Sequence, residues 1–443
     1  MRLALVSLLV LGLMAPAPAP AQECNWQAGW VKAENAKAGN KNWDSDVVMR
    51  FSADFIRRKE AKRVEGYFDQ ASIGCGQSAS LKIMGARSAD VSLYRIGYYK
   101  GAGARLITTI KNAKQITATQ STPPGQYLVK LKSLGYQSTF VPLMITGQVP
   151  SNVVFVSSVL TWQAYNQWGG ESFYKGADGQ RETRAISVSF NRPYDGDGSG
   201  QFRYMEQPLV QLMEKLNLDI NYLTDIDLNK APEINSASII LGGHSEYWTQ
   251  EMRDVIEKEI NEGTNLLVFG GNTAYAKTYL IDRTMNERIP YRDINQPESL
   301  FMGSQFFAVG IKKDLEVQAT QSWPFNVLGQ SQKIKGIYGY EADTAMGTKG
   351  PGVEVLARAS ISPTEKGFVA MSTYYAAPSG AGVLNLGTNA WVCAMANRCP
   401  WGHSFDAKTV QQIRKVTTAI IEQAGREKIG NWRVPHIDIP TRP

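Results

Sequence analysis

The sequence predicts a mixed fold, an N-terminal β-sandwich followed by a doubly wound α/β domain that carries a β-rich insertion. Three observations in this chain of 443 residues indicate this fold. Polar and apolar residues alternate over 44–148, with almost no segment of helical period. After Pro150, apolar runs alternate with amphipathic helical segments. From 281 to about 375, short β-like pieces interrupt this alternation, which predicts the insertion.

The β-sandwich prediction depends on a two-residue period. Over 80–100 and 125–147, apolar side chains occupy alternate positions between turn residues, as in antiparallel strands with one face in a core. Residues 22–43 are polar, rich in Ala, Asn and Lys, and show no sustained period. We therefore interpret them as a leader segment before the sandwich.

The α/β prediction covers 149–443 and indicates a fold of the flavodoxin or glutamine-amidotransferase type. Amphipathic helices lie between its predicted strands, and one of them, 249–263, has Thr249 as N-cap and Gly263 as C-terminal stop. Apolar strands bounded by such helices are typical of a parallel sheet that is covered on both faces. The predicted strands are 152–160, 219–225, 237–243, 265–272 and 382–387.

The N-terminus predicts export. Arg2 precedes a short apolar core, and a small-residue cleavage site of the A-x-A type ends at Ala21. We therefore predict a cleavable signal peptide over 1–21 and a periplasmic or secreted protein. No later segment is long and apolar enough to predict a membrane span.

The four cysteines form an early pair and a late pair. In an oxidising compartment we expect disulfides, because the spacings differ from those of zinc ribbons and zinc fingers. The expected bridges are Cys24–Cys75 and Cys393–Cys399.

The charge of the chain does not predict a nucleic-acid partner. The formal net charge is +7 and the pI is about 9.0, yet Lys and Arg are dispersed and no nucleic-acid-binding motif occurs. We interpret the charge as a contribution to solubility, or as loose affinity for an anionic cell surface.

Polar and aromatic residues follow the predicted strands at their C-terminal ends. Ligands of open α/β sheets bind beyond this edge, so these residues predict a site there. In the stretch GGHSEYW, an extended backbone points His244 and Glu246 to the same side, where imidazole and carboxylate can serve as proton carrier and metal ligand. The alternative is a strand end at which Glu246 caps a helix. The residues at this edge are 161–165, Asp225, His244, Glu246, Asn272, Asn389 and Trp391.

One loop has the spacing of a calcium-binding sequence. Asp195, Asp197 and Glu206 in DGDGSGQFRYME match an EF-hand loop. An EF-hand also needs a helix before the loop, whereas the preceding segment contains Pro193 and β-like residues. We therefore favour a connecting loop, whose last residue starts a helix, over a calcium site. No nucleophile elbow of the G-x-S-x-G type and no phosphate-binding glycine loop occurs.

A set of motifs in the chain resembles the large, catalytic β subunit of N,N-dimethylformamidase. The resemblance covers roughly 44–425 and keeps the order of the motifs in that family. The motifs are TWQAYNQWGG, NRPYDGDGSGQF, GGHSEYW and FGGNTAY, with GYYKGAGARL and GYEAD as further matches.

The resemblance implies a mononuclear iron centre held by two tyrosinates and one glutamate. Glu246 matches the glutamate ligand, and Tyr165 matches one tyrosine. The second tyrosine is expected upstream of Tyr165, where Tyr127 is the best candidate and Tyr136 and the GYY segment compete with it. Phenolate and carboxylate are hard anions that favour Fe³⁺, and such a set balances its charge.

Three further residues are expected to act in catalysis. His244 matches a histidine next to the glutamate ligand, Asn272 a polar group outside the ligand set, and Glu341 a further active-site acid. Since Glu246 as a ligand cannot also be the free base, His244 or Glu341 has to carry protons.

Together these features predict an exported, iron-dependent hydrolase of a carbon–nitrogen bond in a small amide. The alternative is a non-catalytic envelope protein that uses the same scaffold to bind polysaccharide or another ligand. The enzyme that the chain resembles works with a small partner subunit. The sequence therefore predicts either assembly with a small partner subunit or a homo-oligomer, and does not choose between them. A binding protein needs no stoichiometric iron, and metal analysis distinguishes the two functions.

Overall fold

The computed structural model describes residues 24, 26–51, 62–147, 151–359 and 369–443. They form a strand-rich mixture of helices and strands with several sheets, so the predicted mixed class is confirmed. The predicted signal peptide over 1–21 lies outside the described residues. Within those ranges, no helix has the length and apolar character needed to cross a membrane.

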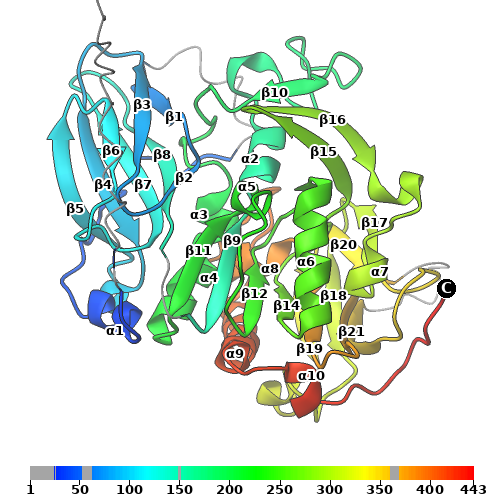
Figure 1. The fold of residues 1–443 in the computed structure, drawn as a ribbon. Coiled ribbons are helices and arrows are strands. Elements are labelled where there is room, and N and C mark those ends of the chain that lie inside the picture. Colours follow the sequence, from blue (N-terminus) through cyan, green and yellow to red (C-terminus); the bar gives the residue numbers. More distant parts are fainter. Residues whose placement is uncertain (1–23, 25, 52–61, 148–150, 360–368) are drawn as a thin grey trace, which may run out of the picture.

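The N-terminal β region, residues 62–147, contains two sheets, drawn in blue and cyan in Figure 1. The two sheets share one hydrophobic cluster, to which Phe68 and Leu81 contribute from one sheet and Val91 and Leu143 from the other. The three-stranded sheet has the order β1 (Glu65–Phe68), β3 (Ser78–Met84) and β6 (Gln115–Thr117). The five-stranded sheet has the order β2 (Ser72–Ile73), β8 (Thr139–Ile145), β7 (Gly125–Lys132), β4 (Asp90–Ile96) and β5 (Ala104–Lys111).

The rest of the chain, the α/β region, is built on a nine-stranded sheet. Five neighbouring strands run parallel, and nearly all of their residues are buried, as expected for strands covered on both faces. β9 comes first in the chain; β11 is added on one side of it and the other three strands on the other side. In sheet order the five are β11 (Ile220–Thr224), β9 (Val153–Ser157), β12 (Ser238–Leu241), β14 (Asn265–Val268) and β23 (Gly382–Asn385).

Much of the segment predicted as an insertion extends the same sheet. Its strands pair antiparallel beyond β23, in the order β22 (Met371–Ala376), β21 (Glu354–Ala359), β18 (Lys313–Val317) and β19 (Lys333–Tyr338). A separate four-stranded sheet has the order β10 (Ser187–Ser189), β16 (Thr284–Pro290), β15 (Ala276–Ile281) and β13 (Tyr247–Trp248). A further pair joins β17 (Gln305–Val309) and β20 (Glu341–Thr344).

Helices pack against the parallel strands, and their ends follow local sequence signals. In α6 (Gln250–Glu262), Thr249 Oγ1 accepts a hydrogen bond from Met252 N at 3.3 Å, and Gly263 ends the helix with φ +111°, as predicted. The other α-helices are α1 (Trp30–Asn35), α2 (Val159–Tyr165), α3 (Phe202–Met205), α4 (Gln207–Lys215), α5 (Asp225–Leu228), α7 (Ser299–Met302), α8 (Ala390–Met395), α9 (Ala407–Ala424) and α10 (Ile429–Trp432). Short 3₁₀ turns are η2 (Tyr99–Gly101), η3 (Trp168–Gly170), η4 (Tyr291–Ile294) and η5 (Phe325–Leu328).

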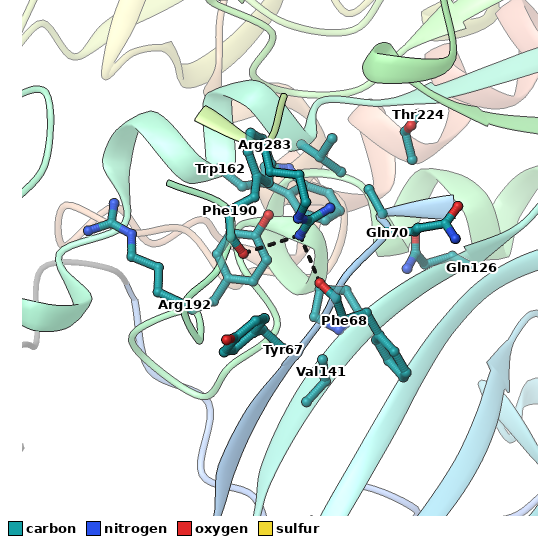
Figure 2. Close-up of a pocket in the computed structure, with 14 residues that line it drawn as sticks. Tyr67, Phe68, Gln70, Gln126, Val141, Trp162, Phe190, Arg192, Thr224 and Arg283 are labelled. Atoms are coloured by element: carbon teal, nitrogen blue, oxygen red, sulfur yellow. Dashed lines mark hydrogen bonds between the residues drawn. The ribbon is translucent and has the colours of Figure 1, made fainter. Parts of the chain in front are cut away.

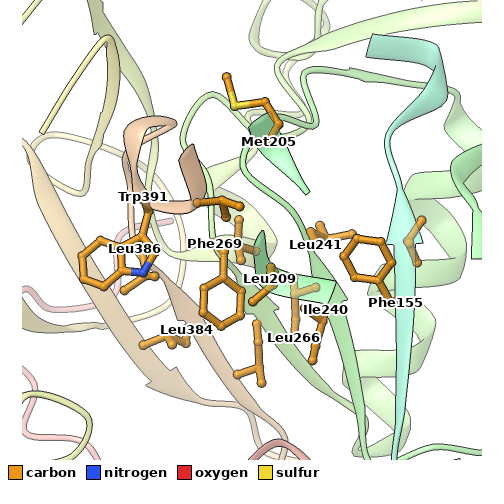
Figure 3. Close-up of a cluster of buried hydrophobic side chains, with 14 of the residues drawn as sticks. Phe155, Met205, Leu209, Ile240, Leu241, Leu266, Phe269, Leu384, Leu386 and Trp391 are labelled. Carbon is orange, nitrogen blue, oxygen red and sulfur yellow. The ribbon is translucent and has the colours of Figure 1, made fainter. Parts of the chain in front are cut away.

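The core of the α/β region lies between the sheet and these helices (Figure 3). Apolar side chains of neighbouring strands meet there, among them Ile240 and Leu266, with Leu209 from α4 and Trp391 from α8. Because this core fixes the parallel strands against one another, it also fixes the loops that leave their C-terminal ends.

A fully buried ion pair joins the N-terminal β region to the α/β region. Arg95 on β4 and Glu214 on α4 have no exposed side-chain surface, and their closest N–O distances are 2.5 and 3.1 Å. Asn35 Nδ2 and the Tyr222 hydroxyl also donate hydrogen bonds to Glu214, at 3.0 and 2.7 Å. Both charges are therefore paired and hydrogen-bonded, which is the condition for burying them.

Both expected disulfides, Cys24–Cys75 and Cys393–Cys399, are present, and none of the described cysteines is free. Disulfides form and persist in oxidising compartments, so the two bridges fit an extracellular or periplasmic protein.

We expect Glu214→Gln to lower the free energy of unfolding by about 3–5 kcal/mol, because it removes the carboxylate that pairs directly with the buried Arg95. Glu262→Gln is the control: its pair with Lys258 on α6 is exposed, and such pairs contribute no more than about 1 kcal/mol. Urea unfolding followed by circular dichroism measures both variants. Equal losses in the two variants would contradict the role given to the buried pair.

Candidate functional site

The candidate site lies beyond the C-terminal ends of the parallel strands, where glycines let two loops meet. Gly242 and Gly243 follow β12, and Gly270 follows β14. An added Cβ at Gly270 would lie 2.8 Å from the carbonyl oxygen of Gly243, and one at Gly242 would lie 2.7 Å from Glu206 Cγ. Side chains at these positions would push the loops apart, so the glycines allow the approach on which the site depends.

Glu246 is the centre of the site. Its side chain is 1% exposed, and Tyr165 and Tyr174 donate hydrogen bonds to Oε2 at 2.7 and 2.6 Å. The Tyr174 hydroxyl also lies 2.8 Å from Oε1, and Arg288 Nη2 donates to Oε1 at 3.0 Å. These donors come from the end of α2, the loop after η3 and strand β16, so three separate segments meet on one carboxylate.

The two phenol rings lie against each other at a tilt of 32°. The ring centroids of Tyr165 and Tyr174 are 4.3 Å apart, and the Tyr247 hydroxyl donates to that of Tyr174 at 3.0 Å. Burial, and next the Glu246 carboxylate, raise the pKa of both Tyr165 and Tyr174 well above its ordinary value. A cation that bound here would therefore replace phenol protons, and its charge would have to stabilise the phenolates.

His244 lies between two carboxylates. Its Nδ1 is 3.0 Å from Gln201 Oε1, and its Nε2 is 3.2 Å from Glu341 Oε2 and 3.7 Å from Glu246 Oε2. The contact to Gln201 favours a proton on Nδ1, and Nε2 lies near both carboxylates with no well-directed hydrogen bond among the described residues. Burial lowers the pKa of His244, but Glu341 and Glu246 outweigh it, and the net shift is upward.

Glu341 and Asn272 complete the site from more distant segments. Asn389 Nδ2 donates to Glu341 Oε2 at 2.9 Å, and the Glu341 backbone N donates to Asn389 Oδ1 at 3.1 Å. Asn272 adopts φ +56°, and its backbone N donates to Asp343 Oδ1 at 2.8 Å. Its own Oδ1 is buried without a hydrogen-bond partner in the described part of the chain, so this amide is available to a ligand.

Tyr127, the expected second tyrosine ligand, does not lie with the other site residues. It lies on β7 in the hydrophobic cluster of the N-terminal β region, fully buried, and its hydroxyl donates to Pro123 O at 2.7 Å. The structure instead places Tyr174 on Glu246, nine positions after Tyr165 in the sequence SFYKG. The sequence indicated a tyrosine upstream of Tyr165, and no motif marked Arg288. Gln201 lies within the motif NRPYDGDGSGQF, but nothing in the sequence indicated its contact with His244.

The residues of the calcium-like loop bond to protein donors. Asp197 accepts hydrogen bonds from Ser199 N at 3.0 Å and Arg203 Nη1 at 2.6 Å, and Asp195 accepts one from Gln167 N at 2.9 Å. Glu206 is directed elsewhere, toward the first turn of α2.

Glu206 anchors the helix that carries Tyr165. Its Oε1 accepts hydrogen bonds from Ser158 N and Trp162 Nε1, both at 3.0 Å. Burial raises the pKa of Glu206 from 4.5 to about 7. The carboxyl therefore binds a proton in the folded protein at pH values where the unfolded chain has released it.

A small cavity of about 30 Å³, lined in part by Trp162, lies between the N-terminal β region and the α/β region (Figure 2). Arg283 Nη2 donates there to the carbonyl oxygens of Phe68 at 2.8 Å and Phe190 at 3.3 Å, and so links the two regions. The cavity has room for about one water molecule. Its lining does not include the donors to Glu246, so we do not assign it to the site.

Taken together, the geometry defines a buried centre of two phenols and a carboxylate beside a His–Glu pair, at the C-terminal edge of a parallel sheet. Residues 90–401 match the family described as N,N-dimethylformamidase beta subunit-like, C-terminal. The chain belongs to this family, which confirms the resemblance carried by its motifs. No curated protein matched the chain.

The donor set fits the ferric ion that the resemblance implies. Among the described residues, no three His, Cys, Asp or Glu side chains gather in a way that could hold a metal ion, whereas two of the three donors here are phenols. The phenol oxygens of Tyr165 and Tyr174 lie within 2.6–2.8 Å of the carboxylate oxygens of Glu246. Oxygen donors of this kind favour Fe³⁺ over softer cations.

We expect the free energy of unfolding to fall as the pH rises from about 4.5 to about 7, because folded Glu206 retains a proton that the unfolded chain releases. The contribution is present in full below this window, is lost above it, and amounts to about 3 kcal/mol. Glu206→Gln removes the titrating group, so this part of the pH dependence should disappear. Urea unfolding of both proteins at several pH values across the window measures it, and parallel curves for the two would contradict the assignment.

Proposed function

We propose that the protein hydrolyses a carbon–nitrogen bond in a small amide, with ferric iron held by Tyr165, Tyr174 and Glu246. The observation that carries the proposal is the meeting of two phenols on one buried carboxylate, with His244 and Glu341 beside it. Membership of the N,N-dimethylformamidase beta subunit-like family supports amide chemistry.

The metal, when bound, supplies a Lewis acid that polarises the amide carbonyl and lowers the pKa of a water molecule. The protein supplies the remaining functions. Glu246 is occupied as a ligand, so His244 takes the proton of the attacking water at Nε2. Glu341, 3.2 Å from Nε2, stabilises the protonated imidazole. As the C–N bond breaks, His244 returns this proton to the leaving nitrogen, and a carboxylic acid and an amine result.

Asn272 orients the amide in this proposal. Its backbone is held by Asp343, whose pKa burial raises to about 7, and its side-chain Oδ1 has no other partner among the described residues. A buried amide that is fixed by its backbone and free at its side chain can bind the substrate without first giving up a protein contact.

The finer architecture and the compartment belong to the same proposal. We assign the N-terminal β region to a β-sandwich domain over 44–148, because its two sheets share one core. We assign 149–443 to a doubly wound domain, because the parallel strands follow the flavodoxin order with β9 at the switch between sides. The two disulfides support export to the periplasm or the medium.

We expect purified protein to contain stoichiometric iron and to be coloured by tyrosinate-to-iron charge transfer. Tyr165→Phe and Tyr174→Phe each remove one oxygen atom with little change in volume, so each should lower iron content and weaken or shift the visible band. Glu246→Gln should also lower iron content. Elemental analysis and absorption spectra measure these effects.

Tyr127→Phe is the matched control, because the same atom is removed from a buried tyrosine of the N-terminal β region. It should leave iron and colour unchanged. Colourless, iron-free wild-type protein grown with sufficient iron would overturn the hydrolase proposal and favour a binding protein. An effect of Tyr127→Phe equal to that of Tyr174→Phe would overturn the ligand set.

We expect His244→Gln to keep its iron and to lower kcat by at least about 100-fold, because a proton carrier is lost without a loss of ligand. Dimethylformamide is the first amide to test, and released amine measures turnover. His436→Gln is the control, since the His436 side chain is 85% exposed and lies outside the site. Unchanged turnover in His244→Gln would show that another group carries the proton.

A further inference from the structure

Arg288 is the cation of the site. It lies on β16, its Nη2 donates to Glu246 Oε1 at 3.0 Å, and its side chain remains 26% exposed. Its guanidinium lies over the rings of Tyr174, Tyr247 and Tyr275, at 5.2, 5.8 and 5.5 Å from their centroids. Three aromatic faces therefore hold the guanidinium plane in one position while part of it remains accessible from outside.

The two oxygen atoms of Glu246 face different chemistry. His244 and, behind it, Glu341 lie on the side of Oε2, at 3.7 Å from Oε2 for His244 Nε2. Arg288 lies on the side of Oε1. The site is therefore polar along one axis, with the proton-carrying pair at one end and the cation at the other.

A filled metal site would leave the charge of Arg288 unbalanced. Two phenolates and the Glu246 carboxylate balance Fe³⁺, and Glu341 already faces His244. The guanidinium has five N–H donors, of which Nη2 faces Glu246, while Nε is buried without a hydrogen-bond partner in the described part of the chain. A partly buried cation with unused donors is stabilised by an anion that can accept two parallel hydrogen bonds.

The neighbouring Arg292 also has a buried Nε without a hydrogen-bond partner in the described part of the chain, but its charge is paired away from the candidate metal ligands. It also lies over Tyr275, at 5.0 Å from the ring centroid, but its Nη2 donates to the buried carboxylate of Glu298 and to Phe306 O. Its charge is therefore balanced within the protein, and it serves to fix Tyr275, on whose ring Arg288 also lies.

We propose that Arg288 binds a carboxylate of the substrate, and that the preferred small amide is an N-acylated amino acid. The scissile amide then lies toward His244, and the carboxylate lies toward Arg288, along the axis of Glu246. The amide half of this proposal rests on the proposed function; the carboxylate half rests on Arg288 alone.

The test compares the affinities of 4-oxopentanoate and its methyl ester, measured by titration calorimetry on the full chain. 4-Oxopentanoate is N-acetylglycine with CH₂ in place of the amide NH, so turnover cannot occur, and the methyl ester replaces the negative charge by a neutral methyl ester group. The proteins are wild type, Arg288→Gln, Arg288→Lys and Arg414→Gln, with iron content determined for each. Arg414 is the matched control because it is an exposed arginine on α9. Its substitution removes one positive charge at a position outside the site.

We expect the acid to bind wild type and Arg414→Gln at least about tenfold more tightly than the ester, as a charge-assisted bidentate pair predicts. In Arg288→Gln the ratio of the affinities for acid and ester should fall to near one. The ratio for Arg288→Lys should lie between those of wild type and Arg288→Gln, because lysine keeps the charge but lacks the planar guanidinium.

Two results would overturn the carboxylate half. One is equal affinity for acid and ester in wild type, a result that does not depend on whether any variant folds. The other is a preference for the acid that persists in Arg288→Gln, since the metal or another group would then bind the carboxylate. Wild-type protein without iron that still shows the Arg288-dependent preference would overturn the hydrolase proposal and leave the carboxylate site standing.

Discussion

The burial of the Glu246 carboxylate is the constraint on which the site is built. A charged carboxylate with almost no exposed surface is stable only if hydrogen-bond donors or cations surround it. Tyr165, Tyr174 and Arg288 meet this requirement from three separate segments. Each donor must therefore be held at hydrogen-bond distance by the packing of its own segment, and any rearrangement of one segment leaves the charge under-compensated. The same property makes the group suitable for binding a cation.

The parallel sheet meets this constraint by bringing the ends of its strands together. β12 ends in glycines that allow the loop after β14 to approach, so His244, Glu246 and Asn272 come from adjacent strand ends. Helix α2, which follows β9, is bound at its first turn by Glu206 and presents Tyr165 at its last residue. The segment predicted as an insertion then adds Arg288 on β16 and Glu341 on β20. That segment therefore contributes to the chemistry of the site as well as to the sheet.

The sequence predicted that several residues which follow strand ends would lie together, and the structure places them close to one another. His244, Glu246 and Tyr165 lie within contact distance of one another, and Glu341 meets His244, as the motifs indicated. Tyr127 lies away from the other candidate residues, and the sequence did not indicate this because a tyrosine in an alternating strand does not show which core it enters. Tyr174 was missed because it lies in an irregular loop, where no period or strand end indicates the direction of a side chain. Arg288 was missed for a different reason: it lies on a regular strand, β16, and its neighbours Tyr247 and Tyr275 are distant in sequence.

The sequence by itself determined what depends on short-range physics: the switch from alternating strands to strands with helices, the caps Thr249 and Gly263 of α6, and the residues placed at the ends of apolar runs. These features follow from backbone preferences and periodicity within about ten residues. Only the tertiary structure decided which tyrosine joins Tyr165, that Arg288 reaches Glu246, and that Gln201 and Asn389 contact His244 and Glu341. Those contacts join segments far apart in the chain, and their partners are selected by the packing of whole strands and loops, which no local pattern records.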